Sequence, residues 1–293
     1  MNGGWLPVAV LAVGSLVVVQ TGRGAEKPAE TPANRENIKA ALKLTQAATA
    51  EYEIRVAGDD KPLELRREPV LRWSNPVQGE VHGNVFVWTR DGRPLVVGSL
   101  FKWFSPFTHM SHEFQSLAEK PLRATFHGAP VWKTSKAGLR FVDVPGAAAP
   151  AASEAQRLLQ LKRLAKDFTG SKKKPRGSET QVRLLPQPIH RYAAPTQGVL
   201  NGALFAFVEG TDPEMFLLIE ARGKSASSAR WQFAATRMVH IEEVRLRHRD
   251  KQVWSEESKT MREVLVEHEG VYTIFRFKEI PDFLKETLAK PKP

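Results

Sequence analysis

The stretch from Lys102 to Phe114, KWFSPFTHMSHEF, gathers residue types that could do chemistry in this chain. Aromatic rings can stack against a sugar or a base, and histidine and glutamate side chains can bind a metal ion or move a proton. The candidate ligand-binding residues of this stretch are Trp103, Phe104, Phe107, His109, His112 and Glu113.

Three interpretations of this loop-like stretch are open. It is a hydrophobic loop that covers a sheet, an apolar ligand-binding surface, or a site for metal binding or proton transfer. His109 and His112 are three residues apart, whereas the helix of a zinc protease places its two histidines four residues apart. The stretch therefore yields no assigned catalytic residue and no assigned metal ligand.

A second candidate site is the basic run RLRHRDK, residues 245–251. On an extended strand Arg245, Arg247 and Arg249 share one face, which could meet phosphate, sulfate or an anionic head group. The alternative is an ordinary solvent-exposed face of a sheet. Another basic run, KKKPR at residues 172–176, is interpreted as solvated charge in a linker.

The composition bounds the function without naming it. The 293 residues have a formal net charge of +11, and 42% of them are hydrophobic, which is normal for a globular protein. The chain has no cysteine, which excludes disulfides, thiol nucleophiles and zinc sites with cysteine ligands. It contains no G-x-S-x-G, P-loop, dinucleotide-binding or calcium-loop motif, so no cofactor is expected.

The N-terminal sequence is typical of a secretory signal peptide. An apolar run of 14 residues, Leu6 to Val19, is too short to span a bilayer comfortably, and small residues follow it. We therefore predict a signal peptide over residues 1–25, with export to the periplasm or cell envelope, and a disordered mature N-terminus over residues 26–34. Because no Lys or Arg precedes the run, an uncleaved anchor is the alternative. No membrane span is expected after it.

The sequence repeats itself at an offset of 119 positions. Between Leu65 and Trp88 eight of 24 residues are identical to those 119 positions later, where roughly one or two would match by chance. The identical pairs are Leu65/Leu184, Pro69/Pro188, Arg72/Arg191, Pro76/Pro195, Gln78/Gln197, Gly79/Gly198, Gly83/Gly202 and Phe86/Phe205. A repeat of this length predicts a duplicated domain. Matched residues are expected to serve the fold, and unmatched ones such as the 102–114 stretch are freer to form a site.

Each repeat is expected to begin with a helix and continue as strands. The segment from Ser153 to Phe168 has apolar residues on one helical face, and Asp91-Gly92 predicts a tight hairpin between two alternating runs. A second hairpin is expected to turn at residues 210–213. The predicted fold class is α+β, with two tandem duplicated units that each pack one helix on an antiparallel β-meander sheet. The predicted units cover residues 35–146 and 153–293, joined by a linker over residues 147–152.

The segments HGNVFVWTRDGRPLVVGSLFKWFSPF, VWKTSKAGLRFVDVP, RLAKDFTG and WQFAATRM resemble uncharacterised exported proteins of planctomycete-like bacteria. This resemblance implies no activity, cofactor or catalytic residue. The favoured expectation is an exported, non-enzymatic binding or scaffolding protein, with an unknown envelope ligand or protein as its partner and no specific nucleic acid. The alternatives are a hydrolase-type or metal-dependent enzyme centred on His109, His112 and Glu113, and an electrostatic adaptor for an anionic polymer.

Overall fold

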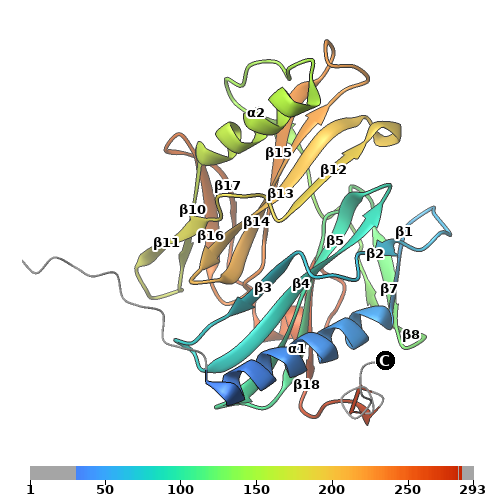
Figure 1. The fold of residues 1–293 in the computed structure, drawn as a ribbon, viewed down its shortest axis with the longest axis vertical. Coiled ribbons are helices and arrows are strands. Elements are labelled where there is room, and N and C mark those ends of the chain that lie inside the picture. The colour runs from blue at the N-terminus through green and yellow to red at the C-terminus, as the bar shows by residue number, and fades with distance from the viewer. Residues whose placement is uncertain (1–30, 283, 286–293) are drawn as a thin grey trace, which may run out of the picture.

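The computed structural model describes residues 31–282, 284 and 285, so the predicted signal peptide and residues 26–30 of the predicted disordered start lie outside the described residues. Three helices occur in the described chain: α1 (Pro32–Ala50), α2 (Glu154–Lys166) and the short α3 (Met261–Leu265). Figure 1 shows α1 at the lower end of the molecule and α2 at its upper end, with the strands between them. Among the described residues, no helix has the length and apolarity needed to cross a membrane.

Local sequence signals account for where the two long helices start. The Thr31 side chain accepts a hydrogen bond from the backbone N–H of Asn34. A proline in the first turn of α1 also favours the helix, because its fixed φ angle is already close to the helical value. The Ser153 side chain accepts a bond from the N–H of Gln156, so the predicted start of the second helix is confirmed. α1 begins at Pro32, inside the segment 26–34 that we expected to be disordered.

The first part of the chain then forms nine strands. The Asp91-Gly92 hairpin is confirmed, with both turn residues at positive φ as a tight hairpin turn requires. The strands are β1 (Tyr52–Val56), β2 (Glu64–Leu65), β3 (Leu71–Ser74), β4 (Glu80–Arg90), β5 (Arg93–Ser105), β6 (Met110–Ser116), β7 (Leu122–Phe126), β8 (Ala129–Lys133) and β9 (Val142–Asp143).

A similar series follows α2. The second hairpin turns at Gly210 and Thr211, so its turn is shorter than expected, since β14 already includes Asp212 and Pro213. The elements are β10 (Phe168–Lys173), β11 (Glu179–Leu184), β12 (His190–Ala194), the 3-10 helix η1 (Pro195–Gln197), β13 (Val199–Glu209), β14 (Asp212–Arg222), β15 (Arg230–Arg237), β16 (Glu243–His248), β17 (Lys251–Glu256) and β18 (Tyr272–Phe277). We call α1 through β9 the first half and α2 through β18 the second half.

Equivalent strands pair in the same register in both halves. In the first half Leu65 lies opposite Trp88 and Trp73 lies opposite Gly83. In the second half Leu184 lies opposite Phe207 and Tyr192 lies opposite Gly202. Each of these second-half residues lies 119 positions after its first-half equivalent. The repeated sequence thus corresponds to repeated strand pairing.

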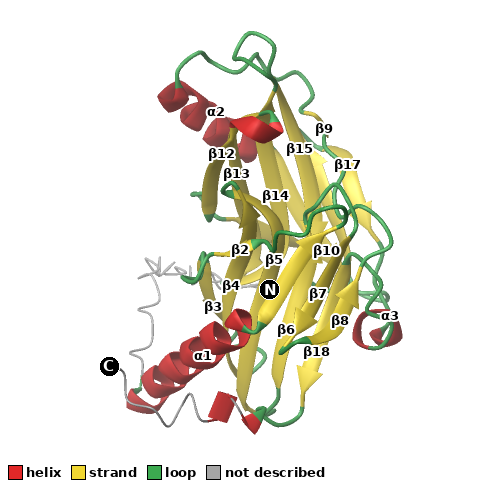
Figure 2. Ribbon diagram, turned by 90° about the vertical axis from the view of Figure 1, so that its right-hand side faces the viewer, coloured by secondary structure: helices red, strands yellow, loops and turns green. Residues whose placement is uncertain are grey.

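Each half supplies the last strand of the other half's sheet. β9 pairs with β15 of the second half through Val142 opposite Phe233, and β18 pairs with β6 of the first half. Strands β10 to β17 form a continuous nine-stranded sheet with β9, in the order β17-β16-β10-β11-β13-β14-β15-β9, with β12 also paired to β13. The first-half strands divide into a six-stranded sheet that includes β18 and a three-stranded sheet, β1-β7-β8. Figure 2 shows these strands as one elongated body, with α1 and α2 on one side of it and α3 on the other.

The predicted fold class is wrong. The protein is mostly β, with 47% of the described residues in strands and 17% helical, and its large antiparallel sheets include a half-barrel rather than two separate helix-on-sheet units. The physical reason is that alternate side chains of one strand face opposite sides of the sheet, and both sides are buried. Phe86 and Trp88 of β4 pack on the side of α1, whereas Val85 and Val87 pack into a cluster shared with the second half.

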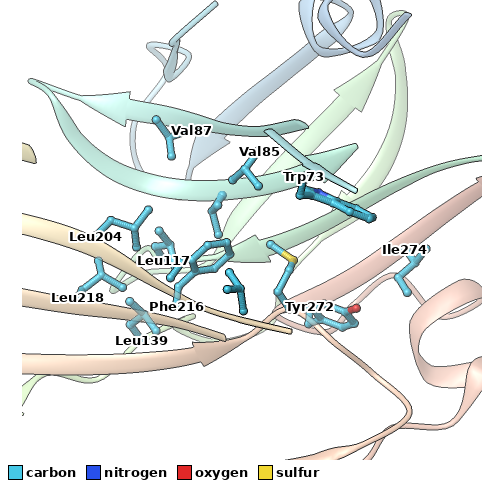
Figure 3. Close-up of a cluster of buried hydrophobic side chains, with 14 of the residues drawn as sticks. Trp73, Val85, Val87, Leu117, Leu139, Leu204, Phe216, Leu218, Tyr272 and Ile274 are labelled. Carbon is cyan, nitrogen blue, oxygen red and sulfur yellow. The ribbon is translucent and has the colours of Figure 1, made fainter. Parts of the chain in front are cut away.

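This shared cluster joins the two halves. Figure 3 shows Val85 and Val87 facing Leu204 and Phe216 across the space between the sheets. β18 adds Tyr272 to the same cluster. The expectation that each unit folds around its own interior therefore holds only for the outer sides of the two sheets.

Candidate functional site

A cavity of about 150 Å³ lies where the turn of the β13–β14 hairpin meets the end of β3. The Thr211 hydroxyl donates to the carbonyl of Ser74 at 2.8 Å and accepts from its N–H at 2.9 Å. The side-chain amide of Asn75 donates to Asp212 Oδ2 at 3.1 Å. We call this space the inter-half cavity, because both halves line it. The first half contributes Trp73, Gln78, Val81, Phe101, Trp103 and Glu113. The second half contributes Lys172, Asp212, Pro213, Glu214 and residues 238–242.

Aromatic rings from the first half form one wall of the inter-half cavity. The Trp73 ring packs against Phe101 with ring centroids 5.3 Å apart, and its Nε1 donates to the Ser99 hydroxyl at 3.0 Å. Trp103 lines the same cavity and is 9% exposed. A wall of this kind offers apolar area and electron-rich ring faces to a ligand.

The opposite wall carries a buried ammonium group among carboxylates. Lys172 Nζ lies 2.7 Å from Glu214 Oε1 and 3.1 Å from Glu209 Oε2. It also lies 3.2 Å from Glu242 Oε2, which forms an ion pair with the ammonium but receives no hydrogen bond. Burial lowers the pKa of Lys172, but Glu214 and the other carboxylates outweigh it, so the pKa is raised and the side chain stays charged.

Several carboxyl groups of the cavity hold their protons to unusually high pH. Burial raises the pKa of Asp212 to about 7, against the lowering effects of Asn75 and Lys172. Burial and the nearby Asp212 raise the pKa of Glu214 to about 8. Burial likewise raises the pKa of Glu113 well above its ordinary value, and the Tyr272 hydroxyl donates a hydrogen bond to it.

A buried arginine holds the wall formed by residues 238–242. The guanidinium of Arg237 donates to the backbone carbonyl oxygens of Val239 at 2.6 Å and Glu242 at 2.7 Å. It also donates to the carbonyl of Glu257. Since this side chain is fully buried, its hydrogen bonds fix the path of the segment that carries Glu242 into the inter-half cavity.

The structure brings two of the six predicted ligand-binding residues to this cavity, Trp103 and Glu113. Phe104 packs instead against His82, with ring centroids 5.9 Å apart. Phe107 is 54% exposed, and its ring contacts those of Trp103 and His109. The 102–114 stretch is not a long loop, because only residues 106–109 separate β5 from β6.

His112 and Glu113 point to opposite faces of β6. The His112 side chain is fully buried on the α1 side, where its Nδ1 lies 2.8 Å from the Tyr52 hydroxyl. Burial lowers its pKa to about 3, so the ring is neutral. Glu113 faces the inter-half cavity, and the two side chains therefore cannot act on one ligand. The predicted grouping of His109, His112 and Glu113 does not form in the structure.

The three predicted anion-binding arginines are already paired with carboxylates. Arg245 Nη2 lies 2.8 Å from Glu243, and Arg247 Nη1 lies 2.9 Å from Glu179. Arg249 Nη2 lies 2.9 Å from Asp167. Arg245 and Arg247 share a face of β16 as predicted, but Arg249 lies after the strand end, in a turn with φ of 48°. These ion pairs occupy the charges that an anionic polymer would need.

No family model, curated protein or solved structure matches the chain. In the part of the chain that the structure describes, no group of three or more histidine, aspartate or glutamate side chains is arranged to hold a metal ion.

The sequence reasoning missed the charged wall of the cavity. Lys172 belongs to the run interpreted as solvated linker charge, yet it lies in β10 and is 7% exposed. Asp212 and Glu214 alternate at the start of an apolar strand, DPEMFLLIEAR. Two carboxyl groups on one face of such a strand indicate a buried polar site, because a buried strand face rarely carries charge without a partner. This pattern was the signal available in the sequence.

Proposed function

We propose that this protein is an exported, non-enzymatic binding protein whose inter-half cavity takes a small organic cation. The observation that carries this proposal is the imbalance of charge in the cavity. Four carboxyl groups line it, from Glu113, Asp212, Glu214 and Glu242, and Lys172 is the one ammonium group among the described lining residues. His240 also lines the cavity, but burial lowers its pKa to about 4 and the ring is neutral at pH 7.

The charge imbalance favours a cation for a definite reason. Burial raises the pKa of Asp212 to about 7 and of Glu214 to about 8, and the attraction of Lys172 does not offset that rise, so both carboxyl groups are partly protonated at neutral pH. A positive group close to them would favour their ionised forms and replace the protons that they hold. Binding of a cation should therefore release protons at neutral pH.

The aromatic wall favours an organic cation. The faces of tryptophan and phenylalanine rings attract an ammonium group by about 0.5–2 kcal/mol, most strongly when water is excluded. Trp73, Phe101 and Trp103 also offer apolar area to alkyl or aryl substituents. Carboxyl groups on one wall and rings on the other match the two ends of an amine with an apolar body.

One feature of the sequence and one of the structure support the rest of the proposal. The apolar run from Leu6 to Val19, followed by small residues, fits an exported protein. The repeated strand registers, with equivalent residues 119 positions apart, support an origin by duplication in which the two copies exchanged their final strands. Such an origin would leave a cavity where two related but now unlike surfaces meet.

Titration calorimetry with benzylammonium tests the proposed ligand class, and benzyl alcohol is the neutral control of the same shape. We expect benzylammonium alone to bind and its affinity to rise between pH 6 and pH 9. The measured heat should change with the ionisation enthalpy of the buffer, because protons leave the carboxyl groups. Trp103→Ala should weaken binding about five- to thirtyfold through loss of the ring contact.

Phe104→Ala is the matched control, since Phe104 lies on the same stretch, packs against His82 and does not line the cavity. It should leave the affinity for benzylammonium unchanged. Equal binding of benzylammonium and benzyl alcohol would contradict the assignment of a cation. An unchanged affinity in Trp103→Ala would show that the ligand binds elsewhere. Export is tested separately by sequencing the N-terminus of the protein recovered from the cell envelope.

A further inference from the structure

A second cavity, of about 510 Å³, lies where the tip of the β4–β5 hairpin meets β12. It is distinct from the inter-half cavity, with which it shares no lining residue. Its volume falls within the range of small-molecule sites, roughly 300–1,000 Å³. The polar side chains of its lining belong to Arg66, Glu154, His190, Arg191, Tyr192 and Asn201.

One guanidinium group at this cavity is held in place by a histidine of fixed tautomer. His190 Nε2 lies 2.9 Å from the carbonyl oxygen of Gly92, which can only accept, so Nε2 carries the ring proton. Nδ1 is then free to accept from Arg66 Nη1 at 3.1 Å. Burial lowers the pKa of His190, which keeps the ring neutral and able to accept. The hairpin tip of the first half thereby orients Arg66 at the cavity.

A second guanidinium group is free to bind a ligand. Arg191 lines the cavity and is exposed, and among the described residues it makes no hydrogen bond or ion pair. A third lies close by, because Arg157 donates to the side-chain oxygen of the buried Asn201. Glu154 is the carboxylate of the lining, so arginines outnumber acidic groups here.

We propose that this cavity binds a small polar molecule that carries an oxyanion, a carboxylate or a phosphate, with Arg66 and Arg191 as its recognition groups. The planar fork of a guanidinium matches both oxyanions and makes charge-assisted hydrogen bonds to them. Tyr192 and Asn201 complete the lining next to that charge, although the Tyr192 hydroxyl already donates to Glu220 and the Asn201 side-chain oxygen already accepts from Arg157. A sugar acid and a sugar phosphate both have this chemistry, and separate titrations with each of them distinguish the two ligand classes.

Calorimetric titration of the full chain at low ionic strength with glucuronate and with glucose 6-phosphate tests the proposal, and glucose is the neutral control. At least one of the two anions should bind and glucose should not. Arg66→Ala and Arg191→Ala should each weaken binding about ten- to a hundredfold, the loss expected for a charge-assisted hydrogen bond. Added salt should also weaken binding.

Arg72→Ala supplies the matched control, since Arg72 is the exposed equivalent of Arg191 in the first half and does not line this cavity. It should leave the affinity unchanged. Both arginines at the cavity are exposed, so their removal should not unfold the protein, and thermal unfolding of each variant checks this. The proposal is overturned if neither anion binds at millimolar concentration. It is also overturned if Arg72→Ala weakens binding as much as Arg191→Ala does.

Discussion

Trp73 lies directly opposite Gly83 in the β3–β4 pair, and a Cβ atom at Gly83 would lie 2.1 Å from Cε2 of the Trp73 ring. Tyr192 and Gly202 repeat this relationship in the second half, where the added atom would lie 2.3 Å from the tyrosine ring. The two glycines are therefore required for space, since an aromatic side chain crosses the backbone at each of them.

Gly83→Ala should destabilise the protein by about 1–3 kcal/mol, because the Trp73 ring has to leave a packed position. Urea unfolding measures the change. The proposed cause is specific to one pair of side chains, so a double-mutant cycle tests it. In a Trp73→Ala background the additional cost of Gly83→Ala should nearly vanish. An equal cost in both backgrounds would assign the effect to the backbone instead.

Removal of Arg93 should destabilise the protein more strongly. Arg93 donates to both carboxylate oxygens of Glu220, at 2.8 and 3.1 Å, and Glu220 is fully buried. Arg93→Met removes both of these bonds and leaves Glu220 with the Tyr192 hydroxyl and with Arg222, whose Nε lies 3.6 Å away. The loss should therefore fall at the lower end of the range of about 3–5 kcal/mol for a broken buried ion pair. The loss should appear as a lower urea midpoint.

The control for Arg93→Met is Arg249→Met, which removes an ion pair of similar length at the surface. Arg249 lies 2.9 Å from Asp167, and its side chain is 61% exposed. Solvent screening limits the loss there to about 0–1 kcal/mol. Comparable losses in the two variants would contradict the importance of burial for the Arg93 pair.

Local signals predicted single elements well but could not predict how the elements combine. The turn at Asp91-Gly92 and the helix cap at Ser153 depend on a few neighbouring residues, and both are confirmed. The exchange of β9 and β18 depends on pairing with strands far away in the chain. β9 contains only Val142 and Asp143, and such a short strand has no period of its own to detect.

The site was predictable to the same extent. The residue types of the 102–114 stretch predicted Trp103 and Glu113 as ligand-binding residues, and both line the inter-half cavity. It also grouped His112 with Glu113, which was wrong because the stretch was interpreted as a loop. Alternation along β6 separates the two residues. Lys172 could not be found from the sequence, since its three carboxylate partners come from other strands and loops.

The stability of the protein should fall as the pH rises from about 6.5 to 8.5. The folded state holds protons on Asp212 up to about pH 7 and on Glu214 up to about pH 8, whereas the unfolded chain releases them near pH 4. The folded state thus binds more protons, so stability decreases through this range by at most about 1.4 kcal/mol per pH unit for each group. Urea unfolding at several pH values measures the slope.

Buried histidines set the lower limit of this range. Burial lowers the pKa of His112 to about 3 and of His240 to about 4, whereas histidines of the unfolded chain release their protons near pH 6.5. Their contribution to the free energy of unfolding therefore rises with pH up to about 6.5 and opposes the contribution of the carboxyl groups there. Asp212→Asn should flatten the decline above pH 6.5. Asp60→Asn, which changes a fully exposed carboxylate, should leave the slope as it is. A wild-type stability that is constant from pH 6.5 to 8.5 would contradict the raised pKa values.

The two halves should stay together after the chain between them is cut. A protease site inserted between Ala148 and Ala149 lies in an exposed part of the linker, away from all strands. After cleavage β9 still completes the second-half sheet, β18 still completes the first-half sheet, and the shared cluster still contains Val85, Phe216 and Tyr272. We expect the fragments to co-elute in size-exclusion chromatography and to unfold in a single transition.

Each half expressed alone should fail to fold cooperatively. The first half then lacks β18 at the edge of β6, and the second half lacks β9 at the edge of β15. Both expose the apolar side chains that the shared cluster buries, which favours association with other chains. Mixing the two halves during refolding should restore the native transition. Separation of the cleaved fragments in native buffer, or sharp unfolding of an isolated half, would mean that each half has a sufficient interior of its own.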